Sequence, residues 1–403
     1  MARPWVPYLT LFLTALITAL VTTPLARKIA TRVGAVDKPG KRRINKVPIP
    51  RMGGIAVFLG IICAFVAEAI GTTYFGWPTV LTPAPHFETL DYHLMVIGFV
   101  AIFATGVLDD IFQLKPLQKF AGQVIAAVIA VASGVVIGVI VNPLTGDALD
   151  LGILAYPITV LYLVAYVNIF NLIDGLDGLA SGLACISSFT MFVLAVMAGR
   201  ADAATLAIAL TGATLGFLRY NFHPASIFLG DSGSLLLGFT LGIVSLLSVT
   251  RTAGLTTIIV PLVIAGIPII DTFSAIVRRK RAHVSIGQAD RGHIHHRLID
   301  EGFDQKQAVL IMYAWTFLLC LGTFGMTQVE VIPRIAIFVA LLVISALIAG
   351  KLHLFRPVLL HHLNPKTGDD ELVTPQDPAF DEEAKRLHEE EAARGPHLHH
   401  KDQ

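Results

Sequence analysis

Hydrophobic residues of this 403-residue chain fall into repeated runs that are separated by shorter polar segments. Most runs are about 20 residues long, which is roughly the length a helix needs to cross the core of a bilayer. The pattern predicts an all-α polytopic membrane protein with about eleven transmembrane helices. The expected spans are 5–27, 52–72, 92–110, 120–140, 152–170, 179–198, 203–219, 232–249, 255–277, 307–326 and 333–353.

Composition supports a membrane protein. The chain is 54% hydrophobic and only 15% charged, with a mean hydropathy of +0.70, unlike a soluble globular domain. The three cysteines, Cys63, Cys185 and Cys320, lie inside apolar runs without CxxC spacing. One membrane domain therefore fits the composition better than a soluble protein of several domains, and the cysteine positions suggest neither a disulfide framework nor a thiolate metal site.

Basic residues are distributed unevenly between the two predicted faces. If residue 1 lies outside, the outer segments carry only Arg3, Arg200, Arg251 and Arg334, and 26 of the 30 basic residues lie inside. Positive loops favour the cytoplasm, so we expect a plasma (inner) membrane protein with its N-terminus outside and its C-terminus cytoplasmic. We divide it into a transmembrane domain, 1–355, and a polar tail, 356–403, which we expect to be disordered or marginally helical.

Acidic residues gather at the cytoplasmic ends of the predicted spans. Asp109 and Asp110 end the third span, Asp174 and Asp177 lie in a glycine-rich interruption, and Asp231 lies at the mouth of the eighth span. Charged groups there are costly unless they have a partner or a function. A cation site would explain them, although a solvated helix end, an interhelical turn and an N-terminal cap are structural alternatives.

Basic and histidine-rich loops occupy the same predicted face. The first inner loop contains Lys46, and a later loop contains His293, His295, His296 and Arg297. These groups suit phosphate oxygens, whereas topology anchoring or a histidine metal site would be alternatives. Carboxylates and bases on one face together indicate chemistry on a Mg²⁺-bound diphosphate at the membrane surface. A secondary transporter should instead carry its acids near the middle of spans.

Five motifs follow one another along the chain: Pro50-Arg51-Met52-Gly53-Gly54, Leu108-Asp109-Asp110, Asn171-Leu172-Ile173-Asp174-Gly175-Leu176-Asp177-Gly178, Phe228-Leu229-Gly230-Asp231-Ser232-Gly233-Ser234 and His293-Ile294-His295-His296. In this order they resemble the motifs of the polyprenyl-phosphate N-acetylhexosamine-1-phosphate transferases (glycosyltransferase family 4), and the resemblance covers about residues 5 to 353. Each motif alone is modest, but the ordered set is highly specific.

The resemblance implies that the oxygen of a polyprenyl phosphate attacks the β-phosphorus of a UDP-sugar and releases UMP, in one step or through a phosphorylated Asp. It implies Mg²⁺, with Mn²⁺ as an alternative. The implied roles are catalytic for Asp109 and Asp110, metal-binding for Asp231 and Asp174, nucleotide-binding for Asn171, Asp177 and Phe228, and phosphate-binding for Lys46, Lys119, His295, His296 and Arg297.

The histidine loop distinguishes two branches of the family. The branch that uses UDP-N-acetylmuramoyl-pentapeptide carries three consecutive histidines, where this chain has His295, His296 and Arg297. The resemblance thus favours UDP-N-acetylglucosamine and undecaprenyl phosphate as substrates, for lipopolysaccharide, teichoic acid or a similar cell-envelope glycan. The expected partners are these substrates and the membrane, without nucleic acid and with a homodimer as one oligomeric option.

Overall fold

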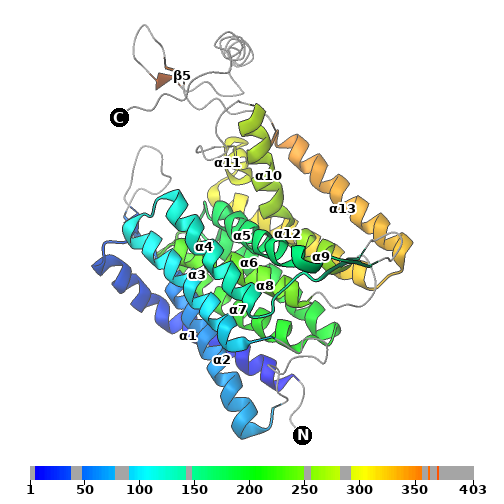
Figure 1. Cartoon of the computed structure of the whole chain (residues 1–403). Coiled ribbons are helices and arrows are strands. Elements are labelled where there is room, and N and C mark those ends of the chain that lie inside the picture. The colour runs from blue at the N-terminus through cyan, green and yellow to red at the C-terminus, as the bar shows by residue number, and fades with distance from the viewer. Residues whose placement is uncertain are drawn as a thin grey trace. The chain divides into compact units, whose positions relative to one another are not determined.

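The computed structural model describes residues 5–37, 48–77, 90–141, 148–248, 256–281, 292–355, 362–363 and 370–371 (Figure 1). Its helices are α1 Val6–Arg32, α2 Gly54–Phe75, α3 Tyr92–Phe112, α4 Pro116–Ala132, η1 Gly152–Leu154, α5 Ala155–Ile173, α6 Leu179–Met197, α7 Ala201–Asn221, α8 Asp231–Ser248, α9 Thr256–Ile264, α10 Gly266–Arg281, α11 Ile294–Asp300, α12 Gln305–Thr327 and α13 Val331–Lys351. Three antiparallel two-stranded pairs join β1 Val36–Asp37 to β2 Ile49–Pro50, β3 Val139–Val141 to β4 Ala148–Asp150, and β5 His362–Leu363 to β6 Asp370–Glu371.

The prediction of an all-α polytopic membrane protein is confirmed. Within the ranges given above, nine helices are long and apolar enough to cross a membrane. The exact number of eleven is not confirmed, because two predicted spans do not appear as long single helices. Of the predicted tail, the structure describes only β5 and β6, so the expectation of disorder or marginal helicity stays a prediction.

The two unconfirmed spans contain helix-ending residues. The predicted span 120–140 corresponds to the 17-residue helix α4, which ends at Ala132 and is followed by Gly134 with a left-handed φ of +100°. The predicted span 255–277 is divided into α9 and α10. Pro261 in α9 and Pro268 in α10 cannot donate backbone hydrogen bonds, and a Cβ on Gly266 would lie 2.7 Å from Leu319. Hydrophobicity alone does not register these interruptions.

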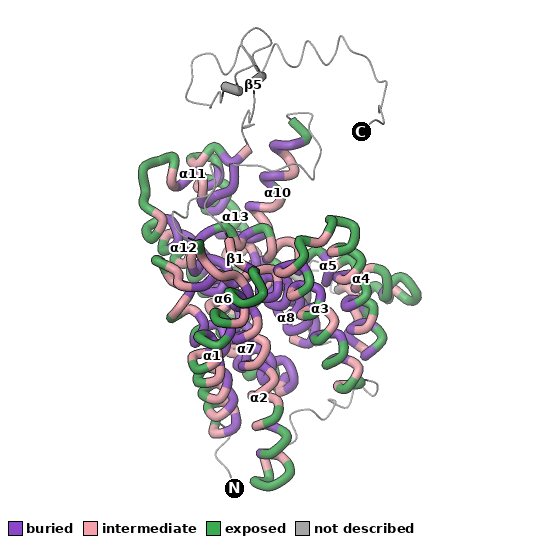
Figure 2. The backbone as a smooth tube through the Cα atoms, turned by 90° about the vertical axis from the view of Figure 1, so that its left-hand side faces the viewer, coloured by how far each residue is buried: buried purple, intermediate pink, exposed green. Residues whose placement is uncertain are grey.

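The chain forms two compact units, Met1–Ile269 with Phe303–Val343, and Ile270–Gly302 with Ile344–Gln403. In the first unit, α8 is the central helix: 89% of its residues are buried, and it packs against α2, α3, α5, α6 and α7. Figure 2 shows the buried residues running through α8 and along the inner faces of α1, α2 and α7.

Small residues allow the helices of the first unit to approach closely. Gly212 and Gly216 of α7 lie one turn apart, and a Cβ on either would come within 2.4 Å of a backbone oxygen of α1. Such small-residue pairs promote helix packing in membranes. The same dense packing brings the end of α3, the start of α4, the end of α5 and the start of α8 together, because α3 contacts α4 and α8 while α5 contacts α4 and α8.

Candidate active site

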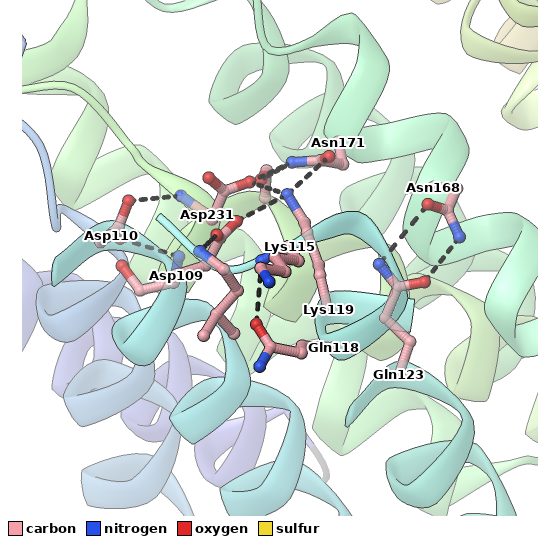
Figure 3. A network of polar contacts seen from close by, with 12 residues as sticks. Asp109, Asp110, Lys115, Gln118, Lys119, Gln123, Asn168, Asn171 and Asp231 are labelled. Carbon is pink, nitrogen blue, oxygen red and sulfur yellow. Dashed lines mark hydrogen bonds and ion pairs between the residues drawn. The ribbon is translucent and has the colours of Figure 1, made fainter. Parts of the chain in front are cut away.

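A polar cluster forms where these four helix ends meet (Figure 3). The Lys119 ammonium of α4 lies 2.9 Å from Asp109 Oδ2, donates to Asn171 Oδ1 at 3.1 Å, and contacts Asp231 Oδ1. Asn171 Nδ2 of α5 in turn donates to Asp231 Oδ1 at 2.6 Å and to Ser234 Oγ at 2.8 Å. Three sequence motifs and Lys119 therefore converge on one site.

The cluster is closed enough for its charges to interact strongly. The side chains of Asp109, Lys119 and Asp231 are 9%, 19% and 23% exposed. Partial burial strengthens electrostatic attraction and makes an unbalanced charge costly. One ammonium thus serves two carboxylates, which leaves the site with an excess of negative charge.

Asp110 faces a different environment from its neighbour Asp109. Its Oδ1 accepts the backbone N–H of Asp231 at 2.9 Å, and its Oδ2 accepts that of Ser232 at 3.0 Å. The side chain of Asp110 is 0% exposed. Asp110 therefore satisfies amides that the first turn of α8 leaves unpaired, while the Asp231 carboxylate remains directed at Lys119 and Asn171. The N-terminal-cap alternative considered for Asp231 is replaced by capping from α3.

Glycines make this close approach possible. Gly230 has a φ of +72°, and a Cβ there would lie 2.6 Å from Asp110 Oδ2. A Cβ on Gly106 of α3 would lie 2.5 Å from the Asp231 carbonyl oxygen. On another side, the backbone of Gly53 donates to Phe228 O at 3.0 Å and that of Gly54 to Leu229 O at 2.9 Å. The glycine-rich motifs thus hold the first turn of α8 by backbone contact.

The loop after α5 contains Asp174 and Asp177 in distinct surroundings. Burial, followed by the negative charges of Asp231, Asp110 and Asp177, raises the pKa of Asp174 to about 8. Asp177 Oδ2 pairs with His223 Nδ1 at 2.8 Å and accepts the backbone N–H of Ala225 at 3.0 Å. Asp174 is thus a carboxyl group in unfavourable surroundings for its charged form, whereas Asp177 connects this loop to the segment that follows α7.

The second unit contains the histidine segment. Asp271 of α10 pairs with His293 Nδ1 at 2.8 Å and accepts the backbone N–H of Ile294, the first residue of α11, at 2.7 Å. Burial, together with the neighbouring His296, lowers the pKa of His295 to about 3. His295 is therefore neutral at physiological pH, and its buried Nδ1 has no hydrogen-bond partner within the described part of the chain.

Comparison with known proteins identifies relatives over most of the chain. A family model described as glycosyl transferase family 4 matches residues 92–249. A probable undecaprenyl-phosphate N-acetylglucosaminyl 1-phosphate transferase of Bacillus subtilis (strain 168) is 37% identical over 326 residues, covering 81% of this chain and 87% of that protein. The chain belongs to glycosyl transferase family 4. A decaprenyl-phosphate N-acetylglucosaminephosphotransferase of Mycobacterium tuberculosis (strain ATCC 25618 / H37Rv) is 34% identical over 326 residues, covering 73% and 76% respectively.

This glycosyl transferase family 4 chain is a multi-pass membrane phosphotransferase. The transporter alternative is therefore set aside. The segment matched by the family model contains Asp109, Lys119, Asn171 and Asp231, so the polar cluster lies within the part of the chain that defines the family.

The cluster offers oxygen ligands of the kind that Mg²⁺ binds. With Lys119 between Asp109 and Asp231, no group of three or more His, Cys, Asp or Glu side chains among the described residues is arranged around a metal position. The donor chemistry nevertheless fits a hard cation, because carboxylate oxygens are preferred by Mg²⁺. Burial first, and then the negative charges of Asp231, Asp110 and Asp177, raise the pKa of Asp174, so a cation there would offset a cost that the protein bears without it. Asp231 and Asp174 thus remain the predicted metal ligands.

The remaining predicted site residues lie in different parts of the chain, and one of them is outside the described residues. Lys46 lies outside the described residues. His295, His296 and Arg297 lie together on α11 in the second unit, where His295 and Arg297 are buried. Phe228 is fixed by its backbone against Pro50, with its ring half-buried. The phosphate and nucleotide roles of these residues stay predictions.

Sequence analysis missed three residues with roles in the site's architecture. Arg51 contacts Asp110, Ser234 accepts from Asn171, and His223 pairs with Asp177. Two of them carried a usable signal: Ser234 follows Asp231 by three positions, which places both on one helix face, and Arg51 lies two positions before the Gly53-Gly54 pair. His223 had no comparable signal.

Proposed function

We propose that this chain transfers N-acetylglucosamine 1-phosphate from UDP-N-acetylglucosamine to undecaprenyl phosphate or a similar polyprenyl phosphate, releases UMP, and requires Mg²⁺. The names of its relatives support the sugar and the lipid acceptor. The observation that carries the proposal is the convergence of Asp109, Lys119 and Asp231, since paired acids beside an ammonium suit a reaction between phosphates.

An apolar cavity supports a lipid acceptor. A cavity of about 680 Å³ lies between α4 and α5 and is lined by apolar side chains that include Phe120, Val124, Val160 and Val164. Phe120 directly follows Lys119 in sequence. We place the first isoprene units in this cavity, because the lipid phosphate would then reach the Lys119 ammonium without leaving the protein surface.

In the proposed reaction, an oxygen of the lipid phosphate forms a bond to the β-phosphorus of the UDP-sugar. The bond between that phosphorus and the bridging oxygen breaks, and UMP leaves with the electron pair. Asp109 Oδ2 accepts the proton when the lipid phosphate is protonated, and Lys119 stabilises the phosphate oxygens. Mg²⁺, held by Asp231 and Asp174, would neutralise charge on the diphosphate.

The UDP-sugar donor determines which side of the membrane we expect the site to face. A UDP-sugar is charged and water-soluble, and the basic loops of the sequence favour the cytoplasmic side for the ends of α3 and α5. We therefore propose a cytoplasmic site in the plasma membrane, with the N-terminus outside and the C-terminus inside. A homodimer stays a prediction.

The competing donor is UDP-N-acetylmuramoyl-pentapeptide. The relatives named above are N-acetylglucosamine phosphate transferases, and the segment His295-His296-Arg297 lacks a third consecutive histidine. Both observations favour the smaller N-acetylglucosamine donor.

Purified full-length protein in lipid nanodiscs tests the proposal. It is incubated with Mg²⁺, undecaprenyl phosphate and one of UDP-N-acetylglucosamine, UDP-N-acetylgalactosamine or UDP-N-acetylmuramoyl-pentapeptide, and both UMP and the lipid product are measured. We expect UMP and a lipid-linked N-acetylglucosamine diphosphate with the first donor. Release of UMP only with the muramoyl pentapeptide would move the chain to the other branch, and no release with any donor would reject the proposed function.

A further inference from the structure

Asp109 and Asp110 are adjacent in sequence, but only one of them faces the cluster. Asp109 Oδ2 lies 2.9 Å from Lys119 Nζ. Both oxygens of Asp110 accept backbone amides at the start of α8, and its side chain is 0% exposed. Figure 3 shows the two carboxylates directed to different sides of the Asp231 segment. A substrate phosphate could thus meet Asp109 without any access to Asp110.

We propose that Asp110 is a positioning residue, which fixes the first turn of α8 so that the Asp231 carboxylate faces Lys119 and Asn171. Asp109 is then the only member of the pair that meets the reacting phosphates. This inference rests on the proposed function, and it assigns different tasks to two residues that sequence analysis treated as equivalent.

Arg51 also supports Asp110. Its Nη2 donates to the carbonyl oxygen of Asp110 at 3.0 Å, and its Nε lies 3.9 Å from Asp110 Oδ1. A positive charge beside a fully buried carboxylate reduces the cost of keeping it ionised. The carboxylate of Asp110 therefore has a charge partner and two backbone donors before any substrate binds.

The packing around Asp110 leaves no room for a reacting group. A Cβ on Gly230 would lie 2.6 Å from Asp110 Oδ2 and 2.8 Å from Oδ1. A phosphorylated Asp110 would need a bond from one of these oxygens to phosphorus, which would break a backbone hydrogen bond and displace the Gly230 segment. The geometry therefore assigns proton transfer and phosphate contact to Asp109.

Asp110→Asn tests the assignment, because an amide offers one acceptor oxygen where the carboxylate offers two. The start of α8 should shift, and Asp231 with it. We expect kcat/KM to fall about ten- to a hundredfold while the midpoint of the acidic limb of the pH–kcat profile stays at the wild-type value. Asp109→Asn should instead abolish turnover, since it removes the group that takes the proton.

A readout without turnover separates positioning from chemistry. Mn²⁺ binding to the full-length protein is measured by electron paramagnetic resonance without substrate, and Asp110→Asn should weaken it about tenfold. Asp91→Asn is the matched control: Asp91 caps the other end of α3 by accepting from His93 N and Leu94 N, about 27 Å from Asp109 along the helix. It should leave both Mn²⁺ binding and turnover unchanged.

Gly230→Ala perturbs the same contact from the opposite side. The added Cβ would press on the Asp110 oxygens, so Gly230→Ala should reproduce the weaker Mn²⁺ binding. The variant that combines Asp110→Asn with Gly230→Ala should bind Mn²⁺ no more weakly than the weaker of the two single variants. Unchanged Mn²⁺ binding in Asp110→Asn and Gly230→Ala, or loss of the acidic limb in Asp110→Asn, would overturn the inference. Absence of UMP release by the wild type would reject the proposed function alone, because Mn²⁺ binding would still report on Asp110.

Discussion

The Lys119 ammonium on α4 lies 2.9 Å from the Asp109 carboxylate on α3. Only Gln113, Leu114 and Lys115 separate the two helices, and Asp109 Oδ1 also accepts the backbone N–H of Leu114 at 2.8 Å. The turn therefore directs Lys119 back to the acid that precedes it. A local α-helical hairpin thus supplies both the Asp109 carboxylate and the Lys119 ammonium of the candidate site.

Lys119→Met should lower kcat/KM for lipid-linked product formation by about a hundredfold or more, because it removes a cationic donor to developing charge. It also leaves Asp109 and Asp231 without their shared partner. Lys115→Met is the matched control, because Lys115 is exposed and lies one turn earlier; its activity should stay within about twofold of wild type. Equal activities for the two variants would show that Lys119 takes no part in the reaction.

Asn171→Ala should raise the Mg²⁺ concentration needed for half-maximal activity by about tenfold, since supporting hydrogen bonds orient metal ligands. The lost contacts are those from Asn171 Nδ2 to Asp231 and Ser234. Asn168→Ala on the same helix serves as the control, because Asn168 donates to Gln123 at 2.7 Å instead. It should reduce thermal stability without shifting the Mg²⁺ response, and the same shift in both variants would contradict a specific role for Asn171.

Hydrophobicity predicted most of the helices because a bilayer requires long apolar helices whose backbone groups are satisfied internally. It failed at α4 and at the break between α9 and α10. There, turn-forming glycine and proline residues decide where a helix ends, and an apolar composition conceals them. Nine long helices among the described residues still follow the predicted spans.

The candidate site was predictable as a gathering of residues, but their individual tasks were not. Asp109, Asp174 and Asp231 were expected on one face, and they interact in the structure. Adjacent residues of a helix point about 100° apart, so the sequence could not show which of Asp109 and Asp110 faces Lys119. That distinction depends on where α8 begins in space.

The buried imidazole of His295 should make stability depend on pH. Its folded pKa of about 3 lies below the ordinary value, near 6.5, so between these values the unfolded chain binds more protons. The stability that neutral His295 contributes is therefore fully present above about pH 6.5 and declines as pH falls toward about 3.

His295→Gln should show a smaller drop in apparent melting temperature between pH 7.5 and pH 5 than wild type, as measured by thermal unfolding in detergent. The exposed His353 provides the control His353→Asn, which should retain the wild-type dependence; an equally steep drop in His295→Gln would refute the prediction.

Filling the apolar cavity should affect the lipid substrate selectively. Val124→Trp places a large ring in the cavity between α4 and α5, where it competes with the first isoprene units for the same apolar surface. The KM for undecaprenyl phosphate should rise about tenfold, as expected for loss of one well-buried apolar contact, while the KM for UDP-N-acetylglucosamine stays unchanged. Ile125→Trp adds the same ring at the next position, where the side chain is 57% exposed and outside the cavity lining. The two variants differ mainly in the direction in which the new ring points from α4. An equal rise in the KM for undecaprenyl phosphate in both variants would therefore indicate a general disturbance of α4 rather than a lipid site.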